Sequence, residues 1–168
     1  MKNIYLVGFM GTGKTTVGRI LAGKLGKDFV EMDEAIEKKE GRRIKDIFAS
    51  EGEGYFRRLE RELLKKISSQ LDLVVSCGGG LVCDSANLKI LKNTGHLFSL
   101  FASPSVIFER IKGSNNRPLL SVSDPLAEIK RLLNLREPYY RQAGIQIDTD
   151  QINPQEVAGR ILRLLDNG

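Results

Sequence analysis

Residues 4–16 read Ile-Tyr-Leu-Val-Gly-Phe-Met-Gly-Thr-Gly-Lys-Thr-Thr, a short apolar run that breaks into a glycine-rich turn. The spacing Gly8-x-x-x-x-Gly13-Lys14-Thr15 matches the P-loop pattern, in which glycines let backbone amides point at phosphates while the lysine and the hydroxyl reach the terminal phosphates and Mg²⁺. The stretch therefore predicts a phosphate site. Its expected nucleotide-binding residues are Gly11, Thr12, Gly13, Lys14, Thr15 and Thr16.

The residues on either side of this loop supply the context that a P-loop needs. Ile4 to Val7 are four apolar residues in a row, as expected of a central parallel strand that is covered on both faces. After the loop, apolar residues recur at helical spacing up to Leu25, and Gly26 stands where a helix would end. Strand, loop and helix follow in the required order, which disfavours a glycine-rich turn that arose by chance.

Length and composition predict a single globular domain over residues 1–168. Such a chain can bury a full core without a disulfide or a structural metal, and 41% hydrophobic with 28% charged residues is ordinary for a globular protein. No apolar run approaches the length of a membrane span, and residue 4 already begins a strand, so we expect a cytoplasmic protein without a membrane partner. We also expect a monomer.

The few cysteine and histidine residues exclude several kinds of site. Cys77 and Cys83 are six residues apart and lack a CxxC pattern, and His96 is the only histidine. Neither a Cys/His metal cluster nor a Ser-His-Asp triad can be built from them. Both cysteines are expected to be reduced.

The net charge of +5 does not by itself predict a nucleic-acid partner. The 26 basic residues are spread along the chain, with no cluster and few aromatic residues beside them. A site for anionic small molecules accounts for the charge equally well, so no nucleic acid is expected to bind.

The rest of the chain alternates between strand and helix patterns, which predicts an α/β fold with a parallel sheet. Further strands are expected at 28–33, 71–76, 96–101 and 145–148. Helices are expected as short pieces over 34–50 split at Gly41, and at 54–69, 84–91, 104–111, 125–136 and 154–165. Pro138 is expected to end the helix that begins at Pro125.

Residues 112–124 show neither helical nor strand periodicity and are long for a connection inside a compact domain. Loops of this kind are often lids. Arg117 lies in this segment and is expected to close over the transferring phosphate. Arg110, just before the segment, is expected to flank the nucleotide base, and Arg136 to serve as an anion anchor.

Asp33 is the predicted catalytic acid. It follows the second expected strand, and ligands bind at the carboxyl ends of strands in open parallel sheets. Phosphoryl transfer depends on positioning and charge neutralisation, so Asp33 would accept the proton of an acceptor hydroxyl or hold that hydroxyl in line. The alternative role is an N-cap for a helix that starts at Glu34.

The Arg57-Arg58 pair and three consecutive glycines are predicted to grip the acceptor. A guanidinium suits a carboxylate or phosphate, and Glu60, three residues after Arg57, can brace it. Residues 78–80 are all glycine, which leaves the backbone free to approach a ligand closely. A solvated charged face is the alternative reading of the arginine pair.

Several features together resemble one enzyme family over residues 1–160. They are Gly8-Phe9-Met10-Gly11-Thr12-Gly13-Lys14-Thr15-Thr16, Asp33, Phe56-Arg57-Arg58, Gly78-Gly79-Gly80, Arg117-Pro118-Leu119-Leu120 and Arg136-Glu137-Pro138-Tyr139-Tyr140. In this order the motifs resemble shikimate kinase. The resemblance implies a three-layer P-loop kinase fold like that of nucleoside monophosphate kinases, with a five-stranded parallel sheet in the order 2-3-1-4-5, an acceptor-binding segment near 33–60 and a lid.

The resemblance also implies an activity and a set of roles. The enzyme would transfer the γ-phosphate of ATP, with Mg²⁺, to the 3-hydroxyl of shikimate, a step toward chorismate and the aromatic amino acids. Asp33 would contact the ring hydroxyls, Arg57 and Arg136 would grip the carboxylate, and Gly78, Gly79 and Gly80 would offer backbone groups. Lys14 and Arg117 would act on the phosphates, and Thr15 would ligate Mg²⁺.

Two positions depart from the family pattern. The family usually has Asp two residues before the acid that matches Asp33, and here that position is Glu31, which is expected to reach the metal through water. Ile152 stands where some relatives carry a basic residue near adenine, so only the backbone of Asn153 and Pro154 is assigned there.

Other functions remain open from the residues alone. A kinase for gluconate or for a nucleoside monophosphate is one alternative, although the glycines and the arginine pair suit a compact anionic acceptor. A nucleotide-binding module without an acceptor is another, and it would leave Asp33 and the arginines idle. A switch GTPase is disfavoured because the guanine-reading pattern Asn-Lys-x-Asp is absent from the sequence.

Overall fold

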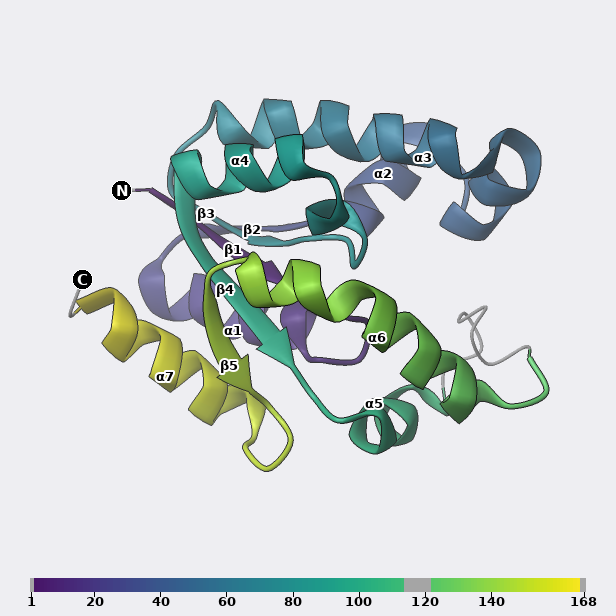
Figure 1. The fold of residues 1–168 in the computed structure, drawn as a ribbon. Coiled ribbons are helices and arrows are strands. Elements are labelled where there is room, and N and C mark those ends of the chain that lie inside the picture. The colour runs from purple at the N-terminus through teal and green to yellow at the C-terminus, as the bar shows by residue number, and fades with distance from the viewer. Residues whose placement is uncertain (1, 114–121, 167–168) are drawn as a thin grey trace.

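The computed structural model describes residues 2–113 and 122–166 and shows a parallel β-sheet between two layers of helices (Figure 1). The strands are β1 (Asn3–Val7), β2 (Asp28–Glu31), β3 (Leu73–Ser76), β4 (Gly95–Phe101) and β5 (Ile145–Asp148). The helices are α1 (Lys14–Leu25), α2 (Met32–Glu40), α3 (Ile44–Ser68), the short 3₁₀ helix η1 (Leu81–Cys83), α4 (Ser85–Thr94), α5 (Pro104–Ile111), α6 (Pro125–Gln142) and α7 (Pro154–Asp166).

The sheet has five strands in the order β2-β3-β1-β4-β5, and every neighbouring pair is parallel. Strand β1 is central, with Ile4 opposite Val74 of β3 on one side and His96 of β4 on the other. The predicted fold class and strand order are therefore confirmed. The carboxyl ends of β1 and β3 run directly into the glycine-rich loop and the triple-glycine turn.

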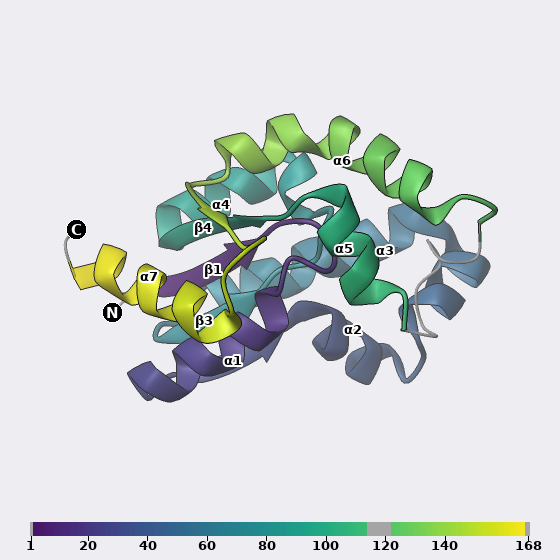
Figure 2. The same ribbon diagram turned by 90° about the horizontal axis from the view of Figure 1, so that it is seen from below.

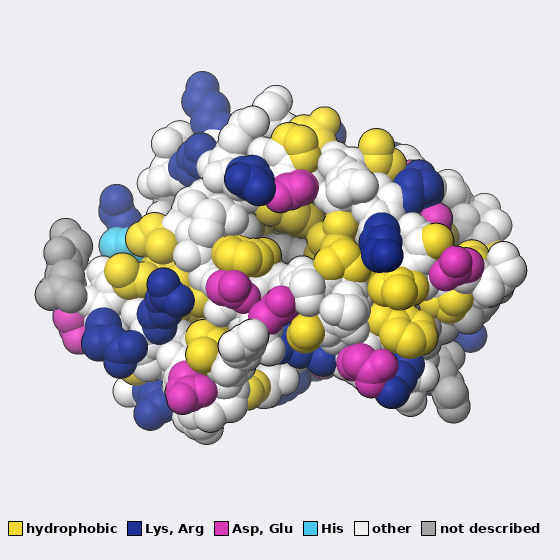
Figure 3. Space-filling model, turned by 60° about the horizontal axis from the view of Figure 1, so that its bottom comes forward, with side chains coloured by type: hydrophobic (Ala, Val, Ile, Leu, Met, Phe, Trp, Pro, Cys, Tyr) yellow, Lys and Arg dark blue, Asp and Glu magenta, His cyan; other side chains and the backbone are white. Residues whose placement is uncertain are grey.

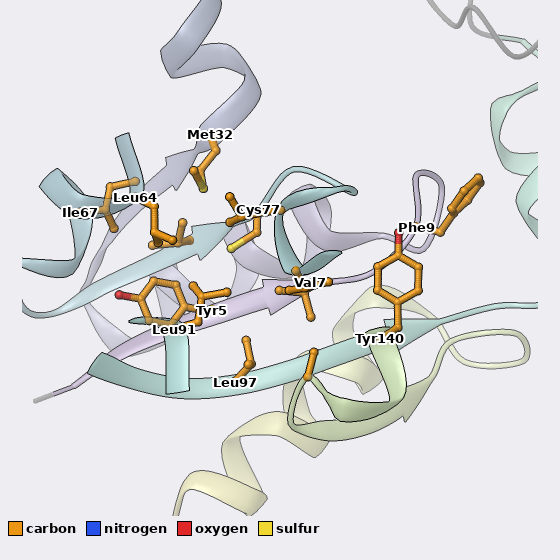
Figure 4. Close-up of a cluster of buried hydrophobic side chains, with 14 of the residues drawn as sticks. Tyr5, Val7, Phe9, Met32, Leu64, Ile67, Cys77, Leu91, Leu97 and Tyr140 are labelled. Carbon is orange, nitrogen blue, oxygen red and sulfur yellow. The ribbon is translucent and has the colours of Figure 1, made fainter. Parts of the chain in front are cut away.

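Helices cover both faces of the sheet, which explains why β1 is apolar from Ile4 to Val7. Ile4 and Leu6 pack in a cluster with residues of α1 and α7, whereas Tyr5 and Val7 pack in a second cluster with residues of α3, α4 and α6. Figures 1 and 2 show these two layers, and Figure 4 shows Tyr5 and Val7 among the buried side chains of the second cluster. A strand buried on both faces has no position for a polar residue that faces water.

Strand β2 and helix α3 have other boundaries than predicted. Strand β2 ends at Glu31, so Asp33 lies in the first turn of α2 rather than at the end of a strand. Helix α3 begins at Ile44 and continues across a kink at Gly52, whose φ of 80° and ψ of 174° are not helical. The second part of this helix corresponds to the predicted helix over 54–69.

The prediction that Pro138 ends helix α6 was wrong. The helix continues to Gln142, with Pro138 inside it. Proline removes one backbone hydrogen bond from a helix, a cost that tertiary contacts of the following turn can offset. That turn carries Tyr140, whose side chain is buried in the second cluster.

Other predicted boundaries are confirmed. Gly26 and Gly41 end α1 and α2 in the left-handed conformation. Asn153 begins α7 with a reciprocal pair of hydrogen bonds, in which its Oδ1 accepts from the Glu156 amide and its own amide donates to Glu156 Oε2.

Most of the expected lid, residues 112–124, and Arg117 within it, lie outside the described residues. Over residues 2–113 and 122–166, no helix is long and apolar enough to cross a membrane.

Candidate active site

A cavity of about 1300 Å³ lies at the carboxyl end of the sheet. It brings together the glycine-rich loop after β1, the start of α2, part of α3, the triple-glycine turn after β3 and residues of α5 and α6. Figure 3 shows a hollow near the middle of one face of the molecule, bordered by hydrophobic and charged side chains. The predicted site residues that line the cavity are Gly11, Thr12, Gly13, Lys14, Thr15, Thr16, Glu31, Asp33, Arg57, Gly78, Gly79, Gly80, Arg110, Arg136 and Pro154.

The glycine-rich loop presents the start of α1 to this cavity. Gly8 has a φ of 140°, and a Cβ there would lie 2.2 Å from the Leu100 carbonyl oxygen, so no larger residue fits. Gly13, in the left-handed conformation, is the N-cap of α1 and offers no side-chain cap, and the first turn of α1 holds no acidic residue. The first amides of α1 therefore remain available to an anion at the positive end of the helix dipole.

Lys14 lies folded over the loop that precedes it. Its Nζ donates hydrogen bonds of 2.9 Å to the carbonyl oxygens of Gly8 and Phe9. Thr12 also donates to the Phe9 carbonyl, at 2.7 Å. The ammonium group is thus held beside the amides of the loop, where it adds a compact positive charge to the same anion site.

Thr15 and Glu31 place oxygen donors side by side near the phosphate loop. The Thr15 hydroxyl donates to Glu31 Oε2 at 2.5 Å, and Glu31 Oε1 accepts from the Asp33 amide at 3.4 Å, which makes Glu31 the N-cap of α2. Hydroxyl and carboxylate oxygens suit Mg²⁺, which usually keeps several waters and binds one or two protein groups together with substrate phosphates. Within the described parts of the chain, no group of three or more His, Cys, Asp or Glu residues is placed to hold a metal alone. This donor set therefore fits a metal that arrives with the nucleotide.

Asp33 lines the cavity from the first turn of α2, and the N-cap role that was its alternative belongs to Glu31. Asp33 Oδ1 is buried, and it lies 3.2 Å from the position that a Cβ on Gly78 would occupy. A carboxylate in the first turn of a helix is favoured by the helix dipole. Asp33 thus lies directly beside the triple-glycine turn.

Arg57 and Glu60 form the ion pair that their spacing predicted. Arg57 Nη1 donates to Glu60 Oε2 at 2.5 Å, and Glu53 binds the other side of the same guanidinium at 3.1 Å. Glu60 is only 1% exposed, and this burial raises its pKa, while the charge of Arg57 opposes the shift. Arg58 instead lies over the Tyr55 ring at 4.9 Å and does not line the cavity. The two adjacent arginines therefore face different surroundings.

The triple-glycine turn packs closely against these charged groups at Gly78 and Gly80. A Cβ on Gly78 would lie 2.3 Å from Glu60 Oε1, and one on Gly80 would lie 2.5 Å from both terminal nitrogens of Arg57. A Cβ on Gly79 would lie 3.6 Å from Arg136 Nη1. Glycine at Gly78 and Gly80 thus allows the backbone to reach the ion pair.

Arg136 and Arg110 approach the cavity from α6 and α5. The Arg136 guanidinium lies 5.7 Å from the centre of the Phe9 ring. Arg110 Nη1 donates to the Gly11 carbonyl at 3.1 Å and to Thr149 Oγ1 at 3.0 Å. Arg110 thus connects the phosphate loop with the segment after β5, which carries Pro154.

Two residues that contact the predicted site were given no role in the sequence analysis. Thr149 is 2% exposed, and its hydroxyl accepts from Arg110 and donates to the Phe101 carbonyl. Thr149 thus holds the Arg110 side chain in place. Tyr140 donates to the Gly79 carbonyl at 2.6 Å. The sequence could have indicated Tyr140 because it is four residues after Arg136, so the two side chains lie on the same face of a helix. This argument requires a helix that continues past Pro138, which we did not predict.

Comparisons with known proteins agree on one family. A family model described as shikimate kinase matches residues 10–166. Shikimate kinase from Thermodesulfovibrio yellowstonii is 50% identical, over 97% of this chain and 94% of the relative. Shikimate kinase from Persephonella marina is 48% identical, over 96% of this chain and 98% of the relative.

Solved structures agree with this result. Shikimate kinase from Acinetobacter baumannii in complex with shikimate superposes with a TM-score of 0.94 at 40% identity, over 99% of this chain and 94% of that one. A gluconokinase from Sinorhizobium meliloti has a TM-score of 0.62 at 20% identity, over 99% of this chain and 94% of that one, a likeness of fold alone. The family model and the near full-length relatives together show that the chain belongs to the shikimate kinase family.

Proposed function

We propose that the protein transfers the γ-phosphate of ATP to the 3-hydroxyl of shikimate and releases shikimate 3-phosphate and ADP. The observation that supports this most directly is one cavity that contains a phosphate loop, a buried carboxylate oxygen of Asp33 and two arginines, Arg57 and Arg136. An anionic acceptor with a free hydroxyl matches these groups chemically. The resemblance to a structure in complex with shikimate supports the choice of acceptor.

The nucleotide half of the proposed mechanism uses the phosphate loop. The amides of residues 11–16 and the Lys14 ammonium hold the β- and γ-phosphates, and Arg117 completes the clamp from the lid. Thr15 and, through water, Glu31 would hold Mg²⁺, which neutralises charge on the phosphates when it is bound. Arg110 and Pro154 flank the base, a role supported by their position on the cavity wall.

The acceptor half uses Asp33 and the charged groups opposite it. Arg57 and Arg136 bind the carboxylate of shikimate, and backbone groups of Gly78, Gly79 and Gly80 contact the ring. The 3-hydroxyl oxygen attacks the γ-phosphorus, the bond from that phosphorus to the β–γ bridging oxygen breaks, and ADP leaves with the electron pair. Asp33 accepts the hydroxyl proton or holds the hydroxyl in line.

The remaining expectations accompany this proposal. Residues 1–168 would act as a single domain and as a monomer, with residues 33–60 as the acceptor-binding segment and 112–124 as the lid. The kink at Gly52 and the left-handed Gly41 support the view that residues 33–60 contain places where the backbone can bend. The cytoplasmic location stays a prediction.

The proposal is tested by ADP release in a coupled assay with MgATP. We expect ADP formation that depends on shikimate, with little on addition of gluconate, AMP or CMP. Equal ADP release with and without shikimate would contradict the assignment. Activity with gluconate alone would support the related kinase instead, and nucleotide binding without acceptor-dependent turnover would support a non-catalytic module.

A further inference from the structure

Tyr140 joins two parts of the cavity wall that are far apart in the sequence. Its side chain is buried, and its hydroxyl donates to the carbonyl oxygen of Gly79, 61 residues away, at 2.6 Å. The Arg136 side chain, one turn earlier on α6, lies beside this contact: a Cβ on Gly79 would lie 3.6 Å from Arg136 Nη1 and 3.8 Å from the Tyr140 hydroxyl oxygen. Figure 4 shows the ring extending from α6 with its hydroxyl end toward the loop that carries Phe9. Arg136, Tyr140 and Gly79 therefore lie together at one part of the cavity wall, with Tyr140 hydrogen-bonded to Gly79.

The hydrogen bond from Tyr140 fixes the orientation of a peptide group in the triple-glycine turn. None of the described residues follows a cis peptide bond, so the amide of Gly80 points away from the Gly79 carbonyl that Tyr140 holds. Among the described residues, no acceptor is found for the amides of Gly79 and Gly80, whereas Leu81 and Cys83 donate to the carbonyls of Gly78 and Gly80. Two adjacent amides of this turn, which lines the cavity, thus donate no hydrogen bond within the described residues.

The glycine turn needs such an anchor more than an ordinary turn does. Three consecutive residues without side chains have the largest backbone freedom, and they make no side-chain contacts of their own. Burial raises the pKa of Tyr140 to about 12, and its hydroxyl stays protonated as a donor throughout the physiological pH range.

We infer that Tyr140 is a positioning residue for the acceptor, which orients the Gly79–Gly80 peptide and the Arg136 guanidinium toward the same ligand. This inference rests on the proposed function, because the acceptor is taken to be shikimate. Tyr140 acts through Gly79 and Arg136 and contributes no group to the transferred phosphate. Its loss should therefore affect the acceptor and spare the nucleotide.

The test is Tyr140→Phe, which removes only the hydroxyl, with Tyr139→Phe as the matched control. Tyr139 is the preceding residue on α6 and is 43% exposed. Loss of one buried hydrogen bond predicts a rise in the KM for shikimate of about tenfold in Tyr140→Phe. The KM for ATP should stay within about twofold of wild type, and Tyr139→Phe should match wild type in both constants. Both variants are assayed well below their melting temperatures, so that lower stability alone leaves the two KM values unchanged.

A double-mutant cycle with Arg136→Lys provides an independent measurement. If Tyr140 and Arg136 act as one unit, the rise in the KM for shikimate in the double variant should be smaller than the product of the two single effects. Multiplicative effects, unchanged KM values in Tyr140→Phe, or equal rises for both substrates would overturn the inference. If the wild-type protein itself shows no shikimate-dependent ADP release, the proposed function fails instead, and the two failures are distinguishable.

Discussion

The Thr15 hydroxyl donates a 2.5 Å hydrogen bond to the carboxylate of Glu31, which is also the N-cap of α2. Glu31 thus connects the phosphate loop to the start of α2. Glutamate is one methylene longer than the aspartate usual in the family, and here it reaches both the Thr15 hydroxyl and the Asp33 amide. Glu31 therefore keeps a carboxylate beside the Thr15 hydroxyl.

Glu31→Gln removes the charge but keeps an oxygen that can cap α2. Because groups around a metal tune its binding, we expect the Mg²⁺ concentration for half-maximal ADP release to rise by about ten- to a hundredfold. A Mg²⁺ titration at fixed ATP and shikimate measures this. Glu62→Gln is the control, since Glu62 is 54% exposed and pairs with Lys39. An unchanged titration in Glu31→Gln would remove Glu31 from the metal site.

Lys14→Ala should reduce kcat/KM by about a hundred- to a thousandfold, because the charge that stabilises the transferring phosphate is lost. The matched control is Lys24→Ala, an exposed lysine in the last turn of the same helix. Coupled ADP release measures activity, and circular dichroism establishes that both variants are folded. Similar activity in the two variants would contradict the assigned role.

Asp33→Asn separates a role in the transition state from a role in binding. If the carboxylate acts on the hydroxyl proton, kcat should fall by about a hundredfold or more while the KM for shikimate changes little. Asp46→Asn is the control, because Asp46 is an exposed aspartate in the first turn of α3. A higher KM with unchanged kcat would assign Asp33 to ground-state binding alone.

Arg57→Ala and Arg58→Ala compare adjacent residues that face different surroundings. Arg57 lines the cavity beside Glu60. Its loss would remove the charge-assisted contact proposed for the acceptor and would leave Glu60 buried without its ion-pair partner. We expect the KM for shikimate to rise by about ten- to a hundredfold in Arg57→Ala, with the KM for ATP nearly unchanged. Arg58→Ala should resemble wild type. Equal changes in the KM for shikimate in the two variants would contradict a specific role of Arg57 in binding the acceptor.

The phosphate loop and the fold class could be predicted because they depend on local chemistry. The order of an apolar strand, glycines and a helix with Lys14 at its start is contained in a few consecutive residues. Alternation of strand and helix patterns then predicted the parallel sheet. The errors in element boundaries lie where local sequence signals are weak. Asp33 is an example, because an aspartate is compatible both with the end of a strand and with the start of a helix.

The sequence by itself determined the P-loop, the α/β alternation and the residue types gathered for phosphoryl transfer. Tertiary structure decided which members of that set share the cavity: Arg57 enters it and Arg58 does not, although both belong to one motif. It also carried α6 past Pro138, so that Tyr140 reaches Gly79. The physical reason is that a proline inside a helix destabilises that helix by about 3 kcal/mol, which is a local effect that the sequence reveals. Burial and hydrogen bonds between distant segments can offset this cost, and these contacts exist only in the folded chain.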